Sequence, residues 1–316
     1  MAEETGGKRL RIRGEPGEPS YKQVAEHMRR YAEMRRAAAR NLEKVKHVVV
    51  VTSTKGGVGK SMVTVNLAAA LALRGLKVGV FDIDFHGPSV HKLLGLPTGM
   101  GLPVTVDGSI VPVTVQPLGI KVVSIGLLLK SDDEAVVWRG PIKASAVNEL
   151  LSYIDWGDLD MLLVDTPPGT GDEVLSLLQL LPRKISGIVL VATPSEITRV
   201  VARKTATLAR QLRAPLLGVV ENMSYFRCRS GEIVYVFGES RGEAFARELS
   251  TRFLGAIPLD PELRRLGDQG VPVVLAAPES ESARAFASIA EKLLQALEEE
   301  EKSREVGEEP SEEGER

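Results

Sequence analysis

The stretch from Val48 to Ser61 constrains this chain most, because it joins an apolar run to a helical pattern through a glycine-rich turn. Its four opening valines predict a strand that is buried on both faces, as in a parallel sheet. From about Gly59 onward the apolar residues follow helical spacing. The glycines between them can take backbone angles closed to other residues, so that successive N–H groups face one anion. The stretch therefore predicts a phosphate-binding loop between a strand and a helix.

The end of this turn fits the P-loop pattern G-x-x-x-x-G-K-[ST], with Thr54 in place of the first glycine. In that pattern Lys60 reaches the β- and γ-phosphates, the Ser61 hydroxyl binds Mg²⁺, and the helix N-terminus adds partial positive charge. The alternative is an ordinary glycine turn before a helix. We expect the loop to bind nucleotide through Thr54, Lys55, Gly56, Gly57, Val58, Gly59, Lys60, Ser61 and Met62.

A second lysine, Lys55, stands just before the glycines and makes the loop more specific. The run K-G-G-V-G-K-S resembles the deviant Walker A loop of the MinD/ParA/nitrogenase iron-protein class of ATPases. In that class the early lysine reaches across a dimer to the partner's nucleotide phosphates. The resemblance therefore implies a homodimer that binds and hydrolyses ATP.

The composition is that of a soluble globular chain, since 43% of the 316 residues are hydrophobic and 26% are charged. The net charge of −2 gives no overall attraction to nucleic acid or to an anionic membrane. No apolar run approaches the roughly 20 residues that span a bilayer, and the N-terminus lacks the pattern of a signal peptide. We therefore expect a cytoplasmic protein without a membrane or nucleic-acid partner.

The chain divides into three parts by composition. Residues 1–46 form a basic N-terminal extension, which is expected to be disordered at first and helical from about Tyr21. We expect this helix to pack on the main domain through a sparse apolar face, the alternative being contact with nucleic acid or acidic lipid. Residues 47–297 form the P-loop ATPase domain, and residues 298–316 an acidic disordered tail.

Apolar strand patterns alternate with helical patterns along the main domain. Each strand is followed by a turn and a helix, which predicts a mostly parallel sheet flanked by helices on both faces. This is the α/β fold of P-loop NTPases. The strands expected after the first lie near Val78–Phe81, Met161–Val164, Ile188–Val191 and Leu216–Val220.

Two aspartates, Asp84 and Asp165, follow expected strands and are candidates for the chemistry. In parallel sheets such residues gather at the carboxyl edge, beside the phosphate loop. By resemblance to the same ATPase class, both approach Mg²⁺ through water, and Asp84 also orients or activates the attacking water. The alternative for each is a helix N-cap. Together with Lys55 and Lys60 they form the expected catalytic set, which needs no covalent intermediate.

Six motifs, which follow one another along the chain, indicate which family of this ATPase class the chain resembles. From about Val48 to Val274 the chain resembles the Mrp/ApbC family of iron–sulfur cluster carrier ATPases, through F-D-I-D-F-H-G-P-S-V, W-R-G-P, D-W-G-D-L-D, D-T-P-P-G-T-G-D, E-N-M-S-Y-F and G-A-I-P-L-D. The resemblance implies a cytoplasmic homodimer that hydrolyses ATP and delivers clusters to apoproteins. It also implies that Asn222 bonds the adenine and that Pro258 lies against the base. A strand-end turn is the alternative for Asn222.

The chain differs from this family in its cysteines. The family carries a C-P-x-C pair directly after E-N-M-S-Y-F, and two such pairs in a dimer supply the four thiolates of a bridging 4Fe–4S cluster. Here the run is R-C-R-S-G, and Cys228 is the single cysteine of the chain. Fe–S clusters generally take four ligands. A cluster on Cys228 would therefore need ligands from elsewhere and should be labile, the alternative being an ordinary loop cysteine.

The expected function is that of an ATP-hydrolysing homodimer that carries Fe–S clusters to apoproteins. Two alternatives stay open. One is an ATP-dependent positioning switch like MinD or ParA, which the basic helix would attach to DNA or membrane. The other is an ATP-gated adaptor that has lost cluster binding, as the single cysteine allows.

Overall fold

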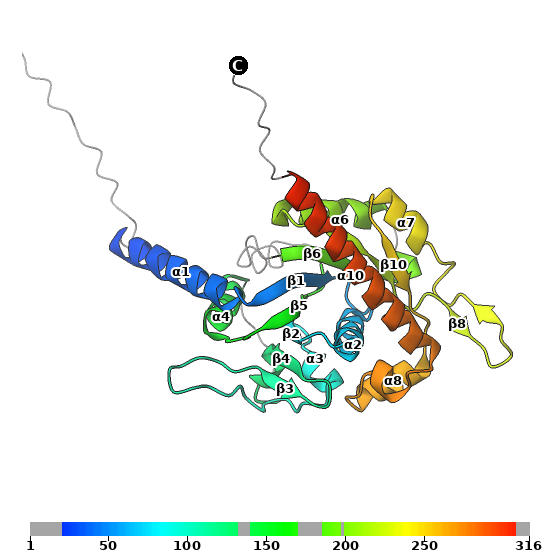
Figure 1. Ribbon diagram of the computed structural model, residues 1–316, viewed down its shortest axis with the longest axis horizontal. Coiled ribbons are helices and arrows are strands. Elements are labelled where there is room, and N and C mark those ends of the chain that lie inside the picture. The colour runs from blue at the N-terminus through cyan, green and yellow to red at the C-terminus, as the bar shows by residue number, and fades with distance from the viewer. Residues whose placement is uncertain (1–20, 132–139, 170–184, 197–198, 308–316) are drawn as a thin grey trace, which may run out of the picture.

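The computed structural model describes residues 21–131, 140–169, 185–196 and 199–307, and one eight-stranded sheet forms its centre (Figure 1). The strands lie in the order β10-β7-β6-β1-β5-β2-β4-β3. They are β1 (Val45–Thr52), β2 (Val78–Asp82), β3 (Val113–Val115), β4 (Ile120–Ser124), β5 (Leu159–Asp165), β6 (Ile185–Ala192), β7 (Leu216–Glu221) and β10 (Phe253–Ala256). A small separate sheet pairs β8 (Phe226–Arg227) with β9 (Ile233–Val234).

Helices connect these strands and cover both faces of the large sheet (Figure 1). The helices described are α1 (Tyr21–Asn41), α2 (Lys60–Leu73), α3 (Val90–Leu93), α4 (Gly140–Tyr153), α6 (Arg199–Leu212), α7 (Gly242–Glu248), α8 (Pro261–Asp268), α9 (Val273–Ala276) and α10 (Glu281–Gly307), with short 3₁₀ turns at Ile125–Leu127 and Pro194–Glu196.

Neighbouring strands of the large sheet run parallel, except that β3 is antiparallel to β4. The mostly parallel α/β fold expected from the sequence is confirmed. The register places Asp165 beside both Val51 and Asp82. Because parallel strands end at one edge of a sheet, the phosphate loop and both acidic segments meet there.

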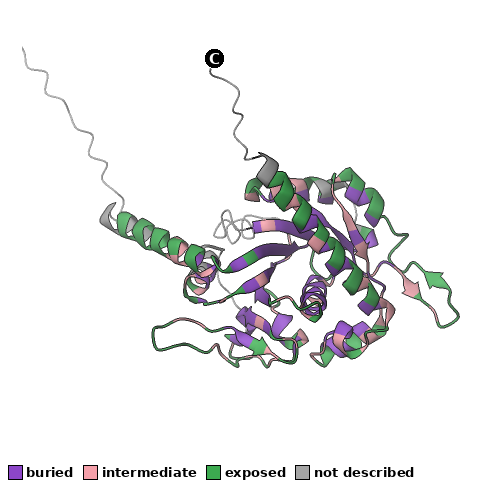
Figure 2. Ribbon diagram, in the orientation of Figure 1, coloured by how far each residue is buried: buried purple, intermediate pink, exposed green. Residues whose placement is uncertain are grey.

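The four valines of β1 divide between two cores, as a strand covered on both faces requires. Val49 and Val51 lie in the core that includes α2 and α10, whereas Val48 and Val50 lie in the core that includes α4. All four are fully buried. Burying such a side chain contributes about 1.5–3 kcal/mol relative to exposing it, so β1 is fixed from both sides. Figure 2 shows the central strands and α2 largely buried.

Helix α1 is anchored at its C-terminal end and projects from the body beyond that point (Figure 1). At the anchored end Ala38 is buried, and Asn41 Nδ2 donates to the carbonyl oxygen of Leu151 on α4 at 3.1 Å. Further out, Met28 is 67% exposed and Tyr31 is 39% exposed. The packing that we expected along the helix is therefore confined, in its described part, to the end that α4 covers.

Helix α10 continues to Gly307, although the sequence predicts a disordered tail from residue 298. The glutamates at its end have a partner that the folded chain supplies, because Arg252 forms ion pairs with Glu299 and Glu300. The expected disorder of residues 298–307 is therefore wrong. A run of glutamates does not by itself reveal a distant arginine.

The two ends of the chain, residues 1–20 and 308–316, fall outside the described residues, and so does the disorder expected for them. No helix in the described part of the chain combines the length and the apolarity that a bilayer crossing requires.

Candidate functional site

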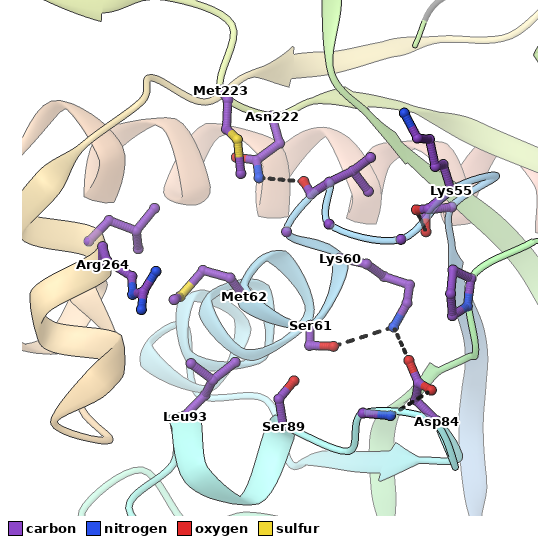
Figure 3. A pocket seen from close by; sticks show the side chains of 18 of the residues that line it. Lys55, Lys60, Ser61, Met62, Asp84, Ser89, Leu93, Asn222, Met223 and Arg264 are labelled. Carbon is purple, nitrogen blue, oxygen red and sulfur yellow. Dashed lines mark hydrogen bonds and ion pairs between the residues drawn. The ribbon is translucent and has the colours of Figure 1, made fainter. Parts of the chain in front are cut away.

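A cavity of about 670 Å³ opens at the carboxyl edge of the sheet, where β1 passes into α2 (Figure 3). Its walls come from segments far apart in the chain, namely the glycine loop, the segments that follow β2, β5, β7 and β10, and helix α8. The volume lies within the range of about 300–1,000 Å³ that is typical of small-molecule sites.

The loop between β1 and α2 has the conformation that its glycines permit. Gly57 and Gly59 have φ values of 83° and 82°, in the left-handed region that favours glycine. At Gly59 a Cβ would also lie 2.3 Å from Asn222 Nδ2, so any larger residue there would have to displace this amide. Helix α2 begins directly after, at Lys60, and presents its N–H groups and positive dipole end to the cavity.

Lys60 extends along the cavity floor and pairs with Asp165. Its Nζ lies 2.8 Å from Asp165 Oδ2 and 3.9 Å from Asp84 Oδ2. Ser61 Oγ donates to the same Asp165 oxygen at 2.6 Å, and Thr64 Oγ1 donates to the other oxygen at 2.7 Å. Asp165 is fully buried, so these partners offset the cost of removing its charge from water.

Asp84 faces Lys60 from the loop after β2 (Figure 3). Its Oδ1 accepts hydrogen bonds from the backbone N–H groups of His86 at 3.0 Å and Gly87 at 3.3 Å. Burial raises the pKa of Asp84 above its ordinary value, and the Lys60 ammonium opposes this rise. A carboxylate so placed can orient a water molecule or accept its proton.

Asp82 supports this loop from within the protein. Its Oδ1 accepts from the Asp84 N–H at 3.0 Å, and its Oδ2 accepts from Ser124 Oγ at 2.8 Å and from the Val90 N–H at 3.3 Å. Burial and the neighbouring charge of Asp165 raise the pKa of Asp82 to about 7. Because Asp82 is fully buried and does not line the cavity, it acts on the loop and not on a ligand.

The other end of the cavity combines apolar side chains, which suit a flat ring such as a nucleobase, with the charged side chains of Asp260, Arg264 and Asp268. Asn222 lies between this end and the glycine loop, where its Nδ2 donates to the Val58 carbonyl oxygen at 2.8 Å (Figure 3). It is 4% exposed, so the contact is sheltered from water. The apolar lining comes from Leu93, Met223, Pro258, Leu259 and Leu263.

Met62 makes a packing contact between two helices at the edge of the cavity. Its side chain fills the space between α2 and α8, since a Cβ on Gly267 would lie 2.4 Å from Met62 Cε. Asn66 Nδ2 lies 3.4 Å from Met62 Sδ. The thioether therefore joins the helix that follows the glycine loop to the helix that walls the cavity.

Comparison with known proteins identifies the family of this chain. A family model described as "ParA: NUBPL iron-transfer P-loop NTPase" matches residues 44–294. The chain belongs to this family. It is 46% identical over 258 residues to an iron–sulfur cluster carrier protein of Saccharolobus solfataricus, which covers 81% of this chain and 86% of that relative. It is also 41% identical to a cytosolic Fe–S cluster assembly factor of Danio rerio, over 81% of this chain and 97% of that relative.

A solved structure of a nucleotide-binding protein from Archaeoglobus fulgidus, in complex with ADP, is similar to this ParA-family chain. The TM-score is 0.67 at 41% sequence identity, over 75% of this chain and 91% of that one. The family and the P-loop NTPase fold that the sequence motifs predict are both confirmed.

In this family member the cavity gathers most of the residues that we expected to bind nucleotide. The run from Lys55 to Met62 lines it, together with Asp84, Asn222 and Pro258. Thr54 is not among the lining residues, and Asp165 lies beneath them in contact with Lys60 and Ser61.

Two further expectations concern Lys55, which lines the cavity, and two of the sequence motifs. The Lys55 side chain extends to the opposite side of the loop from Asp84 (Figure 3). Trp138 and Arg139 of the W-R-G-P motif, and the end of the D-T-P-P-G-T-G-D motif from residue 170, fall outside the described residues.

Cys228 lies away from the cavity, at the turn between β8 and β9. Its N–H donates to the Glu232 carbonyl oxygen at 2.8 Å, and the Gly231 N–H donates to the Cys228 carbonyl oxygen at 2.9 Å. The preceding Arg227 forms an ion pair with Glu281 at 2.8 Å. Among the described residues, no group of three or more His, Cys, Asp or Glu side chains could hold a metal ion. In the described part of the chain, cluster chemistry at this hairpin would thus start from a single thiolate.

Sequence reasoning missed two residues that shape the site. Thr64 lies three residues after Ser61, a spacing that places both hydroxyls on one face of α2 toward Asp165, so the signal was present. Glu221 ends β7 and is fully buried, and its partners are the nearby Ser224 and the more distant Ser240 and Arg241. The sequence does not indicate the two distant partners.

Proposed function

We propose that this protein is a Mg²⁺-dependent ATPase that works as a homodimer and carries Fe–S clusters to apoproteins in the cytoplasm. The convergence of Lys60, Ser61 and Asp165 beneath the glycine loop, at 2.8 and 2.6 Å, carries the proposal. The ADP complex of the A. fulgidus relative supports the nucleotide. The names of the S. solfataricus and D. rerio relatives support the cargo, and the latter supports the cytoplasm.

The oxygen donors at the cavity floor suit Mg²⁺. This ion usually keeps several waters and takes one or two carboxylates together with phosphate oxygens. The Ser61 hydroxyl would bind it directly, and the carboxylates of Asp84 and Asp165 would hold it through water. Bound there, Mg²⁺ would neutralise charge on the β- and γ-phosphates.

Hydrolysis then depends on positioning and charge neutralisation by the residues of the loop. Lys60 and the loop N–H groups hold the β- and γ-phosphates, while Asp84 orients the attacking water. The raised pKa of Asp84 suits a group that accepts a hydrogen bond from that water. Lys55 reaches the nucleotide of the partner subunit, which is consistent with its extension away from its own Asp84 (Figure 3). Asn222 and Pro258 hold the base.

The cluster is the cargo, and Cys228 supplies one thiolate from each chain. A dimer-bound cluster would take its other ligands from exogenous thiols or from non-cysteine groups. Anaerobic reconstitution with iron and sulfide tests this directly. We expect a visible chromophore that elutes with the dimer and that Cys228→Ser removes. A chromophore of equal intensity in Cys228→Ser would contradict the assignment.

The single cysteine also favours a second candidate, an ATP-gated adaptor without a cluster. Nucleotide-driven dimer closure would then be the whole output. Robust ATPase activity with no iron or sulfide bound after reconstitution would support the adaptor. The exposed arginines of α1 make a positioning switch the third candidate, which ATP-dependent and salt-sensitive binding to DNA or liposomes would support.

A further inference from the structure

The hairpin that carries Cys228 is fastened to the end of β7 by one buried carboxylate. Glu221 is the last residue of β7 and is fully buried. It accepts hydrogen bonds from Ser224 Oγ, which precedes the hairpin, and from Ser240 Oγ and the Arg241 N–H at 2.9 Å, which follow it. The segments before and after the hairpin are therefore both hydrogen-bonded to the Glu221 side chain.

The next residue, Asn222, connects the end of β7 to the glycine loop. Asn222 Nδ2 donates to the Val58 carbonyl oxygen in the glycine loop at 2.8 Å, and Gly59 has no room for a side chain because of this amide. Met223 follows with a φ of 55°, in the left-handed region that costs a non-glycine residue about 1–2 kcal/mol. This short link between the nucleotide loop and the hairpin is thus held in one backbone conformation.

A second set of contacts joins the base end of the cavity to the same hairpin root. The Ser224 N–H donates to the Ile257 carbonyl oxygen at 2.9 Å, and the Leu259 N–H donates to the Tyr225 carbonyl oxygen at 2.7 Å. Pro258, between these two, lines the cavity. Displacement of this wall by a bound base would therefore reach the hairpin without passing through the solvent-exposed turn.

Outside its root, the hairpin is also anchored by Glu281 on α10. Tyr225 Oη donates to Glu281 Oε1 at 2.9 Å, and Arg227 Nε donates to Glu281 Oε2 at 2.9 Å. Both contacts lie between the root and Cys228, on the first residue of α10. In the described part of the chain, the carboxylates of Glu221 and Glu281 both hold the hairpin that carries the thiol, and Glu221 directly precedes Asn222 of the cavity wall.

We propose that Glu221 is a positioning residue for the Cys228 thiol, which it couples to the nucleotide cavity. Through Asn222 and the Pro258 segment, filling the cavity shifts the hairpin root, and Glu221 carries the shift to both of its ends. The accessibility of Cys228 Sγ then differs between the empty and the nucleotide-bound protein. The inference rests on the proposed function, because it requires a nucleotide in the cavity, and it would allow the ATPase cycle to time cargo transfer.

The single cysteine makes the test specific, since a thiol reagent can report on no other residue. The rate at which 5,5′-dithiobis(2-nitrobenzoate) modifies Cys228 is measured in the full chain with and without saturating Mg·ADP. For the unmodified protein we expect the two rates to differ by about fivefold or more, the lower end of typical coupling between sites. In Glu221→Gln and in Asn222→Ala the ratio should fall toward one.

The matched control is Glu239→Gln, which removes an exposed carboxylate just before Ser240 and should keep the original ratio. Ser240→Ala removes one of the hydrogen bonds to Glu221 and should give an intermediate ratio, which keeps the test open if Glu221→Gln folds poorly. Calorimetry gives the Mg·ADP concentration that saturates each variant, and this concentration should rise for Asn222→Ala, whose side chain lines the cavity.

A ratio of one in the unmodified protein with Mg·ADP bound would overturn the inference, as would an unchanged ratio in both Glu221→Gln and Ser240→Ala. Failure of the unmodified protein to bind Mg·ADP at all is a different outcome. That result would overturn the proposed function, and the coupling with it.

Discussion

Lys60 Nζ and Asp165 Oδ2 lie 2.8 Å apart beneath the glycine loop, in an ion pair that is almost wholly buried. Ser61 and Thr64 complete the hydrogen bonding of the carboxylate. The same ammonium that neutralises Asp165 is therefore in place to meet phosphate oxygens at the cavity floor. Removing one partner of such a pair leaves a buried charge without its counterion.

Lys60→Ala should lower the affinity for Mg·ATP by about 100-fold, because hydrogen bonds to charged groups contribute about 1.5–3 kcal/mol each. Calorimetry measures the affinity, and thermal unfolding shows whether the variant still folds. Lys77→Ala, at an exposed lysine before β2, is the control and should bind as the unmodified protein does. Affinity unchanged in Lys60→Ala would contradict the P-loop assignment.

If Lys55 serves the partner subunit, as proposed, Lys55→Ala should bind ATP but fail to hydrolyse it. Asp84→Asn should be inactive for a separate reason, because it removes the carboxylate that is proposed to orient water. A mixture of the two inactive variants should regain roughly a quarter of the activity, because half of the dimers then contain one complete site. The assay is steady-state phosphate release. A mixture that stays inactive would show that Lys55 acts within its own subunit.

Gly59→Ala should destabilise the chain more than Gly57→Ala. Both residues have positive φ, which costs about 1–2 kcal/mol for alanine, but only at Gly59 would the new Cβ lie 2.3 Å from Asn222 Nδ2. We expect a further cost of about 1–3 kcal/mol from this overlap, measured by urea unfolding. The double variant Gly59→Ala/Asn222→Ala should recover most of the extra cost. Equal stabilities of the two glycine variants would exclude the overlap.

Asp82→Asn should destabilise the protein by about 1–3 kcal/mol, because one of the donors that face this side chain loses its acceptor. Urea unfolding gives the free energy. Asp158→Asn, at an exposed aspartate, should change it little. If Asp82→Asn is as stable as the control, the hydrogen bonds to Asp82 do not hold the Asp84 loop.

The hairpin restraint by Glu281 should weaken in acid. Hydrogen bonds from Arg227 hold the pKa of the Glu281 carboxyl below its usual value of 4.5. A lowered pKa in the folded chain stabilises the fold above the unfolded value, and this contribution disappears as the pH falls through the lowered pKa. Since both groups are partly exposed, solvent screens the ion pair and the effect should be small.

Hydrogen exchange of the Cys228 amide measures this restraint as a protection factor. Glu281→Gln should lower the protection at neutral pH about as much as acid does in the unmodified protein. Glu262→Gln, which breaks an ion pair with Arg265 on α8, should leave it unchanged. Protection in Glu281→Gln equal to that of the unmodified protein at every pH would refute the restraint.

Much of this site could be predicted because its parts are encoded locally. The valines of β1 and the glycines that follow specify a strand, a loop and a helix start within a few residues. Asp84 and Asp165 could be placed beside that loop because strands of a parallel sheet end at one edge, whatever the chain length between them. Thr54 was the exception, since the sequence alone does not show which side of the loop a residue faces.

The remainder depends on contacts between distant segments. Asn222 could be assigned to the site, but its hydrogen bond to Val58 joins residues 164 positions apart, and no spacing rule reports it. The hydrogen bonds of Glu221 with Ser240 and Arg241, and the ion pairs of Arg252 with Glu299 and Glu300 on α10, also join segments that are separated in the sequence. Exposure of Met28 and Tyr31 on α1 likewise depends on where α4 stops, which the sequence of α1 does not contain.

The Met62 side chain occupies the space that a side chain at Gly267 would need. This contact limits which residues can occur together at positions 62 and 267 in members of the family. A threonine at position 62 would leave a hole beneath α8 that glycine cannot fill, whereas a larger residue at position 267 would force Met62 aside. The two positions should therefore change in step. Relatives with a threonine at position 62 should carry a side chain at the place of Gly267, and a swap of both at once should be tolerated where either change alone is not.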